Sequence, residues 1–163
     1  MAKKTKGLSP MDYALSYLTG KDRTYWEMFN YLDSKDFGEA DIESTLARLE
    51  ELKLIDDRRY ASRFIQTRLA SKPLSKEHIR RQLFEHHINK DIIDEAIAEV
   101  SDDSDLINAI EVANKFYRQF SNLDPEKRRL RVLSRLQARG FSLDICCKAF
   151  EQASSYIGEE LEK

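Results

Sequence analysis

The stretch LDSKDFGEADIESTLARL, residues 32–49, decides the fold because the chain repeats its apolar pattern twice more. The pattern returns as LFEHHINKDIIDEAIAEV at 83–100 and as LQARGFSLDICCKAFEQA at 136–153. The shared apolar positions are the trios Leu32/Leu83/Leu136, Phe37/Ile88/Phe141, Ile42/Ile93/Cys146 and Leu46/Ile97/Phe150. A period of about fifty residues predicts stacked supersecondary units that share an extended apolar core. Chains of this kind usually work as binding surfaces.

Helix start signals accompany each copy of the pattern. Ser9 is followed by Pro10 and Asp12, and Thr24 is followed three residues later by Glu27, which is a capping box. Further start signals are Ser75, Asn89, Asp124-Pro125 and Ser142. We therefore predict an all-α protein made of three tandem three-helix, helix-turn-helix-like modules in an elongated, curved arrangement. Their expected bounds are 9–55, 56–100 and 101–154, with an acidic tail over 155–163.

The turn between the second and third helix of each module has a common form. It reads Asp36-Phe37, His87-Ile88 and Gly140-Phe141 in the three copies. Asp, His and Gly tolerate a positive φ better than most residues. We expect the first residue of each pair to be left-handed and the second to turn back into the core.

Composition is typical of a soluble helical protein. Charged residues make up 34% of the chain and hydrophobic residues 41%, with only five Gly and three Pro. No apolar run approaches the roughly 20 residues that a membrane helix needs. No apolar segment follows the basic start at residues 1–6, so we expect no signal peptide. Two adjacent cysteines form no disulfide framework, which favours a cytoplasmic protein.

The net charge of −2 conceals alternating blocks of opposite sign. Residues 33–57 carry a net charge of −6 and residues 58–81 carry +7, whereas 91–105 carry −7 and 126–140 carry +5. One interpretation is that these blocks are solvated helix faces and cross-helix ion pairs. The other is that the basic blocks form a surface for an anionic partner.

The stretch LEELKLIDDRRYASRF, residues 49–64, resembles the joining segment of the RecX family, the bacterial regulators of the RecA recombinase. Three other stretches are similar to other parts of the family's sequence: Ala14-Leu15-Ser16-Tyr17-Leu18, Ile79-Arg80-Arg81-Gln82-Leu83 and Arg139-Gly140-Phe141-Ser142. The resemblance covers residues 10–153. Two positions depart from the family pattern: Lys53 replaces a usual glycine, and His86-His87 replaces a basic residue followed by glycine.

The resemblance implies a regulator that binds the RecA nucleoprotein filament and lowers its ATPase, strand-exchange and coprotease activities in recombination, DNA repair and the SOS response. No motif in the sequence indicates catalysis, so we expect no enzyme activity and no cofactor. We expect a monomer with no membrane association and with at most weak, salt-sensitive DNA binding. Two alternatives are a helix-turn-helix or winged-helix transcription regulator, and a helical-repeat adaptor with another protein partner.

Arginines are the best candidates for contact with RecA or nucleic acid, because guanidinium groups bind phosphate and carboxylate bidentately. Arg128, Arg131 and Arg135 lie on one face of their predicted helix, and folding alone gives no reason for three like charges there. The complete candidate set is Arg58, Arg59, Arg63, Lys76, Arg80, Arg81, Arg128, Arg131 and Arg135.

The remaining reactive side chains favour structural interpretations. Cys146 occupies an apolar position of the repeat, so we expect a buried thiol. The three histidines have no converging thiolates or carboxylates that predict a zinc site, and no spacing indicates a catalytic residue. Trp26 is expected to pack over the first helix, or alternatively to anchor a partner.

Overall fold

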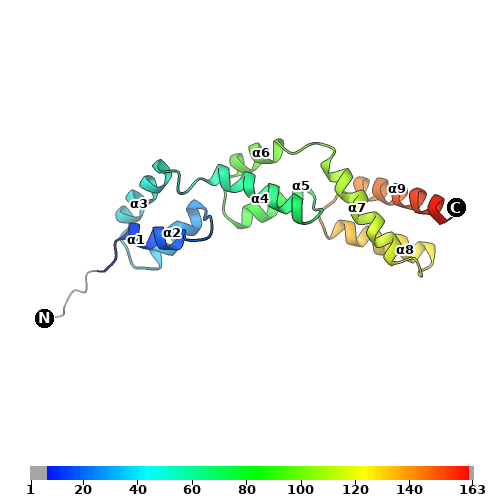
Figure 1. Ribbon diagram of the computed structural model, residues 1–163, viewed down its shortest axis with the longest axis horizontal. Coiled ribbons are helices and arrows are strands. Elements are labelled where there is room, and N and C mark those ends of the chain that lie inside the picture. Colours follow the sequence, from blue (N-terminus) through cyan, green and yellow to red (C-terminus); the bar gives the residue numbers. More distant parts are fainter. Residues whose placement is uncertain (1–6, 162–163) are drawn as a thin grey trace. The chain divides into compact units, whose positions relative to one another are not determined.

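The computed structural model describes residues 7–161, and their side chains as far as residue 157. This part of the chain contains nine α-helices and no strand, as predicted (Figure 1). The helices are α1 (Pro10–Tyr17), α2 (Tyr25–Asp33), α3 (Glu39–Glu51), α4 (Asp57–Ser71), α5 (Lys76–Glu85), α6 (Lys90–Ala98), α7 (Ser104–Gln119), α8 (Pro125–Gln137) and α9 (Leu143–Leu161). The basic start at residues 1–6 lies outside the described residues. Within the expected acidic tail, residues 155–161 continue α9.

The helices begin where the sequence predicts. Ser9 with Asp12 and Thr24 with Glu27 form complete capping boxes, in which each side chain accepts the backbone N–H of the other residue. Asp124 accepts the backbone N–H of Lys127 at the start of α8. Side-chain oxygens also accept backbone N–H groups at the other predicted positions, Ser75, Asn89 and Ser142. These caps satisfy N–H groups that have no partner within their helix.

The three turns adopt the predicted left-handed conformation. Asp36 has a φ of 60°, His87 a φ of 55° and Gly140 a φ of 83°. Lys53, which follows α3, is also left-handed, with a φ of 57°. Gly140 is enclosed as well, because a Cβ at this residue would lie 2.5 Å from Oγ of Ser75. Glycine is therefore needed for space in the third turn.

Burial agrees with the predicted register of the repeat. Leu32, Leu83 and Leu136 are all fully buried, and so is Cys146. Burial raises the pKa of the Cys146 thiol to about 11, so this cysteine is a neutral core group as predicted.

The first and third modules each have a core of their own. In the first module, α1, α2 and α3 pack around a cluster that includes Met28 and Leu46. In the third module, α7, α8 and α9 pack around a cluster that includes Phe116 and Phe150. Each of these modules therefore buries its apolar stripes among its own three helices.

The chain divides into two compact units, and the division crosses the middle module. One unit comprises Met1–Arg63 and Leu83–Ile93, and the other comprises Phe64–Gln82 and Asp94–Lys163. Each unit contains one joint between consecutive modules.

The joint in the first unit is built at the start of α2. The backbone N–H of Tyr25 donates to Oδ1 of Asp57, the first residue of α4, at 2.9 Å. The buried hydroxyl of Thr24 donates to the backbone carbonyl of His86 at 3.3 Å. The start of α2 thus contacts both the first helix and the left-handed turn of the following module.

The joint in the second unit repeats this arrangement at the start of α5. The backbone N–H of Lys76 donates to Oδ1 of Asp105 in α7 at 2.8 Å. The backbone N–H of Ser75 donates to the carbonyl of Arg139, next to the turn of the third module, at 3.3 Å. Consecutive modules are therefore joined in the same way twice, each time through an aspartate and a turn.

Candidate functional site

Several of the predicted basic residues are held by ion pairs or by backbone carbonyls. Arg63 forms an ion pair with Asp22, and Arg80 forms ion pairs with Asp94 and, at 3.4 Å, with Glu77. Such pairs at a partly exposed surface contribute about 0–1 kcal/mol each. These two arginines therefore have a structural role already.

Lys76 and Arg59 are tied to the backbone. Nζ of Lys76 donates to the carbonyl of Val100 at 2.8 Å and lies 3.3 Å from Oδ1 of Asp102. Nη2 of Arg59 donates to the carbonyl of the left-handed Lys53 at 2.9 Å. Both side chains therefore help to hold the connections between helices.

The charge blocks of the sequence are partly paired with each other. Lys76 and Arg80 belong to the basic block 58–81, and their partners Asp102 and Asp94 belong to the acidic block 91–105. The interpretation of cross-helix ion pairs thus holds for this part of the second unit. It leaves the exposed arginines as candidates for an external partner.

Arg128 corrects the expectation that the arginines of α8 have no role in folding. Its Nε donates to the carbonyl of Phe120 at 3.3 Å, and its Nη2 donates to the carbonyls of Ser121 at 2.7 Å and Leu123 at 3.1 Å. The carbonyls at the end of a helix have no partner within that helix. Arg128 therefore caps the end of α7 and holds the connection to α8.

Three of the candidates remain exposed without such a role. Arg81 and Arg131 are exposed, and neither makes a hydrogen bond, ion pair or ring contact with the described part of the chain. Arg135 is also exposed, with its guanidinium 5.6 Å from the ring centroid of Phe116. All three lie in the second unit, and they are the predicted residues best placed to contact a partner.

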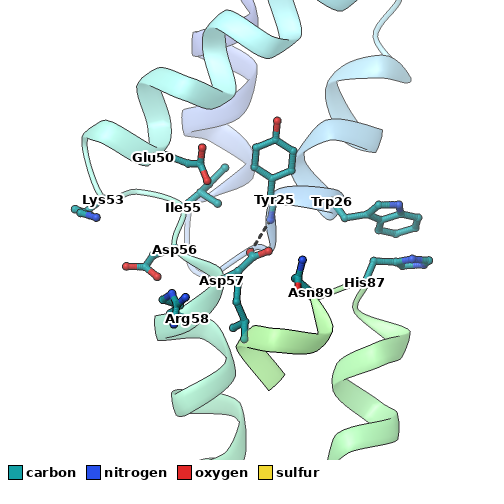
Figure 2. A pocket seen from close by; sticks show the side chains of 11 residues that line it. Tyr25, Trp26, Glu50, Lys53, Ile55, Asp56, Asp57, Arg58, His87 and Asn89 are labelled. Carbon is teal, nitrogen blue, oxygen red and sulfur yellow. Dashed lines mark hydrogen bonds between the residues drawn. The ribbon is translucent and has the colours of Figure 1, made fainter. Parts of the chain in front are cut away.

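A groove of about 540 Å³ lies at the joint of the first unit (Figure 2). Tyr25, Asp57 and Asn89 lie near its centre, and the dashed line marks the bond from the N–H of Tyr25 to Asp57. Arg58, another predicted residue, is exposed and lines this groove. The lining also contains Lys53, Glu50 and Asp56, so it favours no single class of charged partner.

Trp26 contacts the following module, which the sequence does not indicate. Its ring stacks on His87 of the following module with the ring centroids 3.7 Å apart, as Figure 2 shows at the edge of the groove. The stacking adds to the joint between the modules. The Trp26 side chain nevertheless remains 43% exposed.

His86 also belongs to this joint. Its Nδ1 lies 3.3 Å from Oε1 of Glu27 and 3.4 Å from the hydroxyl of Tyr60. Glu27 belongs to the capping box of α2, and Tyr60 belongs to α4. His86 and His87 thus contact the first module from the turn in which the sequence departs from the RecX pattern.

Sequence reasoning missed two residues that the structure brings forward. Asp57 is one of several acids in its block, and only the fold shows that it accepts the N–H of Tyr25. Burial raises the pKa of Asp57, with smaller contributions from Asp56 and Glu27, and the hydrogen bond from Tyr25 opposes this rise. Arg129 lies off the helix face that Arg128, Arg131 and Arg135 share, so the spacing that singles out those three does not include it.

Within residues 7–157, no three His, Cys, Asp or Glu side chains converge in a way that would hold a metal ion. Over residues 7–161, none of the helices combines the length and the apolar character needed to cross a bilayer.

Family models match the chain three times in succession. Residues 11–49 match the first three-helix domain of RecX, residues 56–97 the second and residues 103–150 the third. The matches follow the order in which these domains are named.

Individual relatives agree with the family models. The regulatory protein RecX of Chlorobium phaeobacteroides is 33% identical over 130 residues, which cover 80% of this chain and 83% of that protein. The regulatory protein RecX of Bacillus pumilus is 27% identical over 92% of this chain but 56% of its own length. The chain therefore spans only about half the length of some relatives.

Solved structures show the same fold. A crystal structure of RecX from Lactobacillus salivarius matches with a TM-score of 0.82 at 24% identity, over 89% of this chain and 94% of that one. A second crystal structure, of a regulatory protein RecX, matches with a TM-score of 0.74 at 26% identity, over 83% of this chain and 67% of that one. With three RecX domains in order and a relative at 33% identity, this chain belongs to the RecX family of regulatory proteins.

Proposed function

We propose that this chain binds the RecA nucleoprotein filament and lowers its ATPase, strand-exchange and coprotease activities. It would thereby regulate recombination, DNA repair and the SOS response, with no catalytic chemistry of its own. The observation that carries the proposal is the presence of all three RecX domains in order over residues 11–150.

The way in which the modules are joined supports this function physically. Each joint uses an aspartate and a turn to fix one module on the next. A filament presents the same protomer surface repeatedly, so modules in series can each make modest contacts with it. Several linked contacts raise avidity without any single strong site.

The exposed arginines are the proposed contact residues. The guanidinium groups of Arg81 and Arg131 make no hydrogen bond, ion pair or ring contact with the described residues, and that of Arg135 lies over the ring of Phe116. Their guanidinium groups are suited to phosphates of the bound DNA or to carboxylates of RecA. Because the net charge of the chain is −2, we expect its binding to bare single-stranded DNA to be weak and steeply salt-dependent.

Co-sedimentation with preformed filaments tests the proposal. RecA of the same organism is assembled on single-stranded DNA with a slowly hydrolysed ATP analogue, and the chain is added before centrifugation. We expect the chain to pellet with the filament and to stay in the supernatant with bare DNA at physiological salt. Equal recovery with both, or with neither, would contradict the proposal.

The two alternatives make different predictions. A winged-helix regulator needs strands for its wing, and the described residues contain none. A helix-turn-helix regulator without a wing would protect a defined duplex sequence in footprinting. An adaptor for another protein would retain that protein in a pull-down and would not pellet with RecA filaments.

A further inference from the structure

The second helix of the third module begins one turn earlier than its counterparts. In the register of the repeat, Arg128 occupies the position of Thr24 and Ser75, which cap the starts of α2 and α5. In the third module, however, the helix already begins at Pro125 and is capped by Asp124. Residues 125–128 are therefore an additional helical turn.

The additional turn changes which groups this part of the helix offers to a ligand. In the first two modules the first residue of the helix donates its backbone N–H to an aspartate of the next module, Asp57 or Asp105. The corresponding residue of the third module is Arg129, which lies inside α8. Because Arg129 lies inside α8, its backbone N–H cannot bind an aspartate of a further module. The guanidinium groups of Arg128 and Arg129 lie at this position instead.

A groove of about 240 Å³ lies beside the two arginines. Its walls come from all three helices of the module: Tyr117 from α7, Arg128 and Arg129 from α8, and Phe150 and Ser154 from α9. The groove therefore belongs to a single compact core.

Both arginines are oriented by aromatic rings. The guanidinium carbon of Arg128 lies 4.9 Å from the ring centroid of Tyr117, and that of Arg129 lies 5.3 Å from the ring centroid of Phe150. The hydroxyl of Tyr117 is in turn 3.3 Å from that of Ser154. A guanidinium group that stacks on an aromatic ring lies parallel to the ring, so its N–H donors point sideways and away from the ring.

Hydrogen-bond donors remain available on both arginines. Arg128 donates three N–H groups to the carbonyls at the end of α7 and one to the hydroxyl of Tyr117, which leaves one of its five. Arg129 is exposed, and within the described residues its guanidinium makes no hydrogen bond or ion pair. Glu126 is the one acid of the lining, so the groove carries a net positive charge.

We propose that the groove between α7, α8 and α9 binds an acidic peptide segment of a partner protein, with an Asp or Glu carboxylate held between Arg128 and Arg129. The two joints within the chain use an aspartate carboxylate at the corresponding position, which favours a carboxylate ligand. Nucleic acid is disfavoured because guanidinium groups already lie over the rings of Tyr117 and Phe150, where bases would stack. This inference does not depend on the partner being RecA.

Fluorescence anisotropy with the full chain tests this site. The probe is a short labelled peptide of alternating Asp and Glu. Arg129→Gln should weaken its binding about tenfold, the size expected for one hydrogen-bonded charge pair. Lys127→Gln is the matched control, since it removes one positive charge from an exposed position on the same helix outside the groove. We expect the control to bind within about twofold of the parent.

Three outcomes would overturn the proposal. The peptide fails to bind the parent chain, or the two variants lose the same affinity, which would indicate unspecific attraction between charges. In the third outcome, labelled oligothymidylate binds the parent chain more tightly than the peptide does, and Arg129→Gln weakens that binding. The groove would then be a phosphate site. Helicity of both variants is compared with the parent by circular dichroism, and both substitutions are at exposed positions.

Discussion

Arg128 shows at the residue scale what a helical pattern cannot predict. Its position on one face of α8 follows from the spacing in the sequence, but its partners are the carbonyls that end α7. Those carbonyls come near only because α7 and α8 pack together. The sequence therefore identifies an arginine face and does not distinguish the capping arginine from Arg131, three residues later.

Replacing Arg128 tests this capping role. Arg128→Ala removes three charge-assisted hydrogen bonds and should lower the free energy of unfolding by about 1.5–3 kcal/mol. Arg131→Ala removes the same kind of side chain from an exposed position and should change it by less than about 0.5 kcal/mol. Urea unfolding followed by circular dichroism measures both, and equal costs would show that Arg128 has no special role.

Asp57 links the first joint to pH. Burial raises the pKa of Asp57 in the folded state. Between pH 3.8 and this raised pKa, the folded chain therefore holds a proton on Asp57 that the unfolded chain has already lost. The contribution of this group to the free energy of unfolding therefore falls as pH rises from the ordinary Asp pKa of 3.8 through the raised pKa of the folded state, and it changes no further above that pH.

Asp57→Asn isolates this effect. Asparagine retains an Oδ1 that accepts the N–H of Tyr25 but has no proton to lose. We expect the variant to lack this acid-range decrease in stability, and to be at least as stable as the parent at neutral pH. Urea unfolding at a series of pH values measures the difference, and parallel curves for the two proteins would show that Asp57 does not titrate differently on folding.

At the scale of elements, the helix starts and the turns were predictable because their signals are local. A capping box spans four residues, and a left-handed turn depends on the residue that adopts it. The joints were not predictable. Nothing in the sequence separates Asp57 from Asp56, or Asp105 from Asp103, because each bond depends on how one module packs on the next.

The third turn offers a test of the element-scale account. Gly140→Ala places a Cβ 2.5 Å from Oγ of Ser75 in a residue with a φ of 83°, so it should destabilise the chain by about 2 kcal/mol or more. Asp36→Gly is the opposite change, from a residue with a Cβ to glycine. Glycine adopts the φ of 60° in the first turn without a steric cost. It should be neutral or stabilise by up to about 1 kcal/mol.

Urea unfolding measures both turn variants under the same conditions. A Gly140→Ala variant as stable as the parent would show that the third turn and Ser75 can move apart without cost. The enclosure of Gly140 would then be irrelevant to the second joint.

At the scale of the whole molecule, the blocks of charge were visible in the sequence but their use was not. Arg63 and Arg80 look as available as Arg81 in the sequence, yet both are paired with acids. The pair Arg63–Asp22 joins residues 41 positions apart, which only the tertiary fold brings together. Sequence reasoning therefore gave a candidate set that contains both structural cations and residues available to a partner.

Two substitutions address the proposed contact surface of the molecule. Arg81→Glu combined with Arg131→Glu reverses two exposed charges that make no hydrogen bond, ion pair or ring contact with the described residues, so stability should change little. Reversal turns attraction to phosphates or carboxylates into repulsion. The control combines Lys148→Glu with Arg48→Glu, which reverses two exposed charges on α9 and α3 that are paired within their own helices.

The most direct test of the central claim is the rate of ATP hydrolysis by preformed RecA filaments as this chain is titrated in. We expect the parent and the control to inhibit hydrolysis at similar concentrations. We expect Arg81→Glu with Arg131→Glu to need at least about tenfold more protein for the same inhibition. Hydrolysis that is unaffected by the parent chain would contradict regulation of the filament, and a charge-reversed variant that inhibits as well as the parent would contradict the arginine surface.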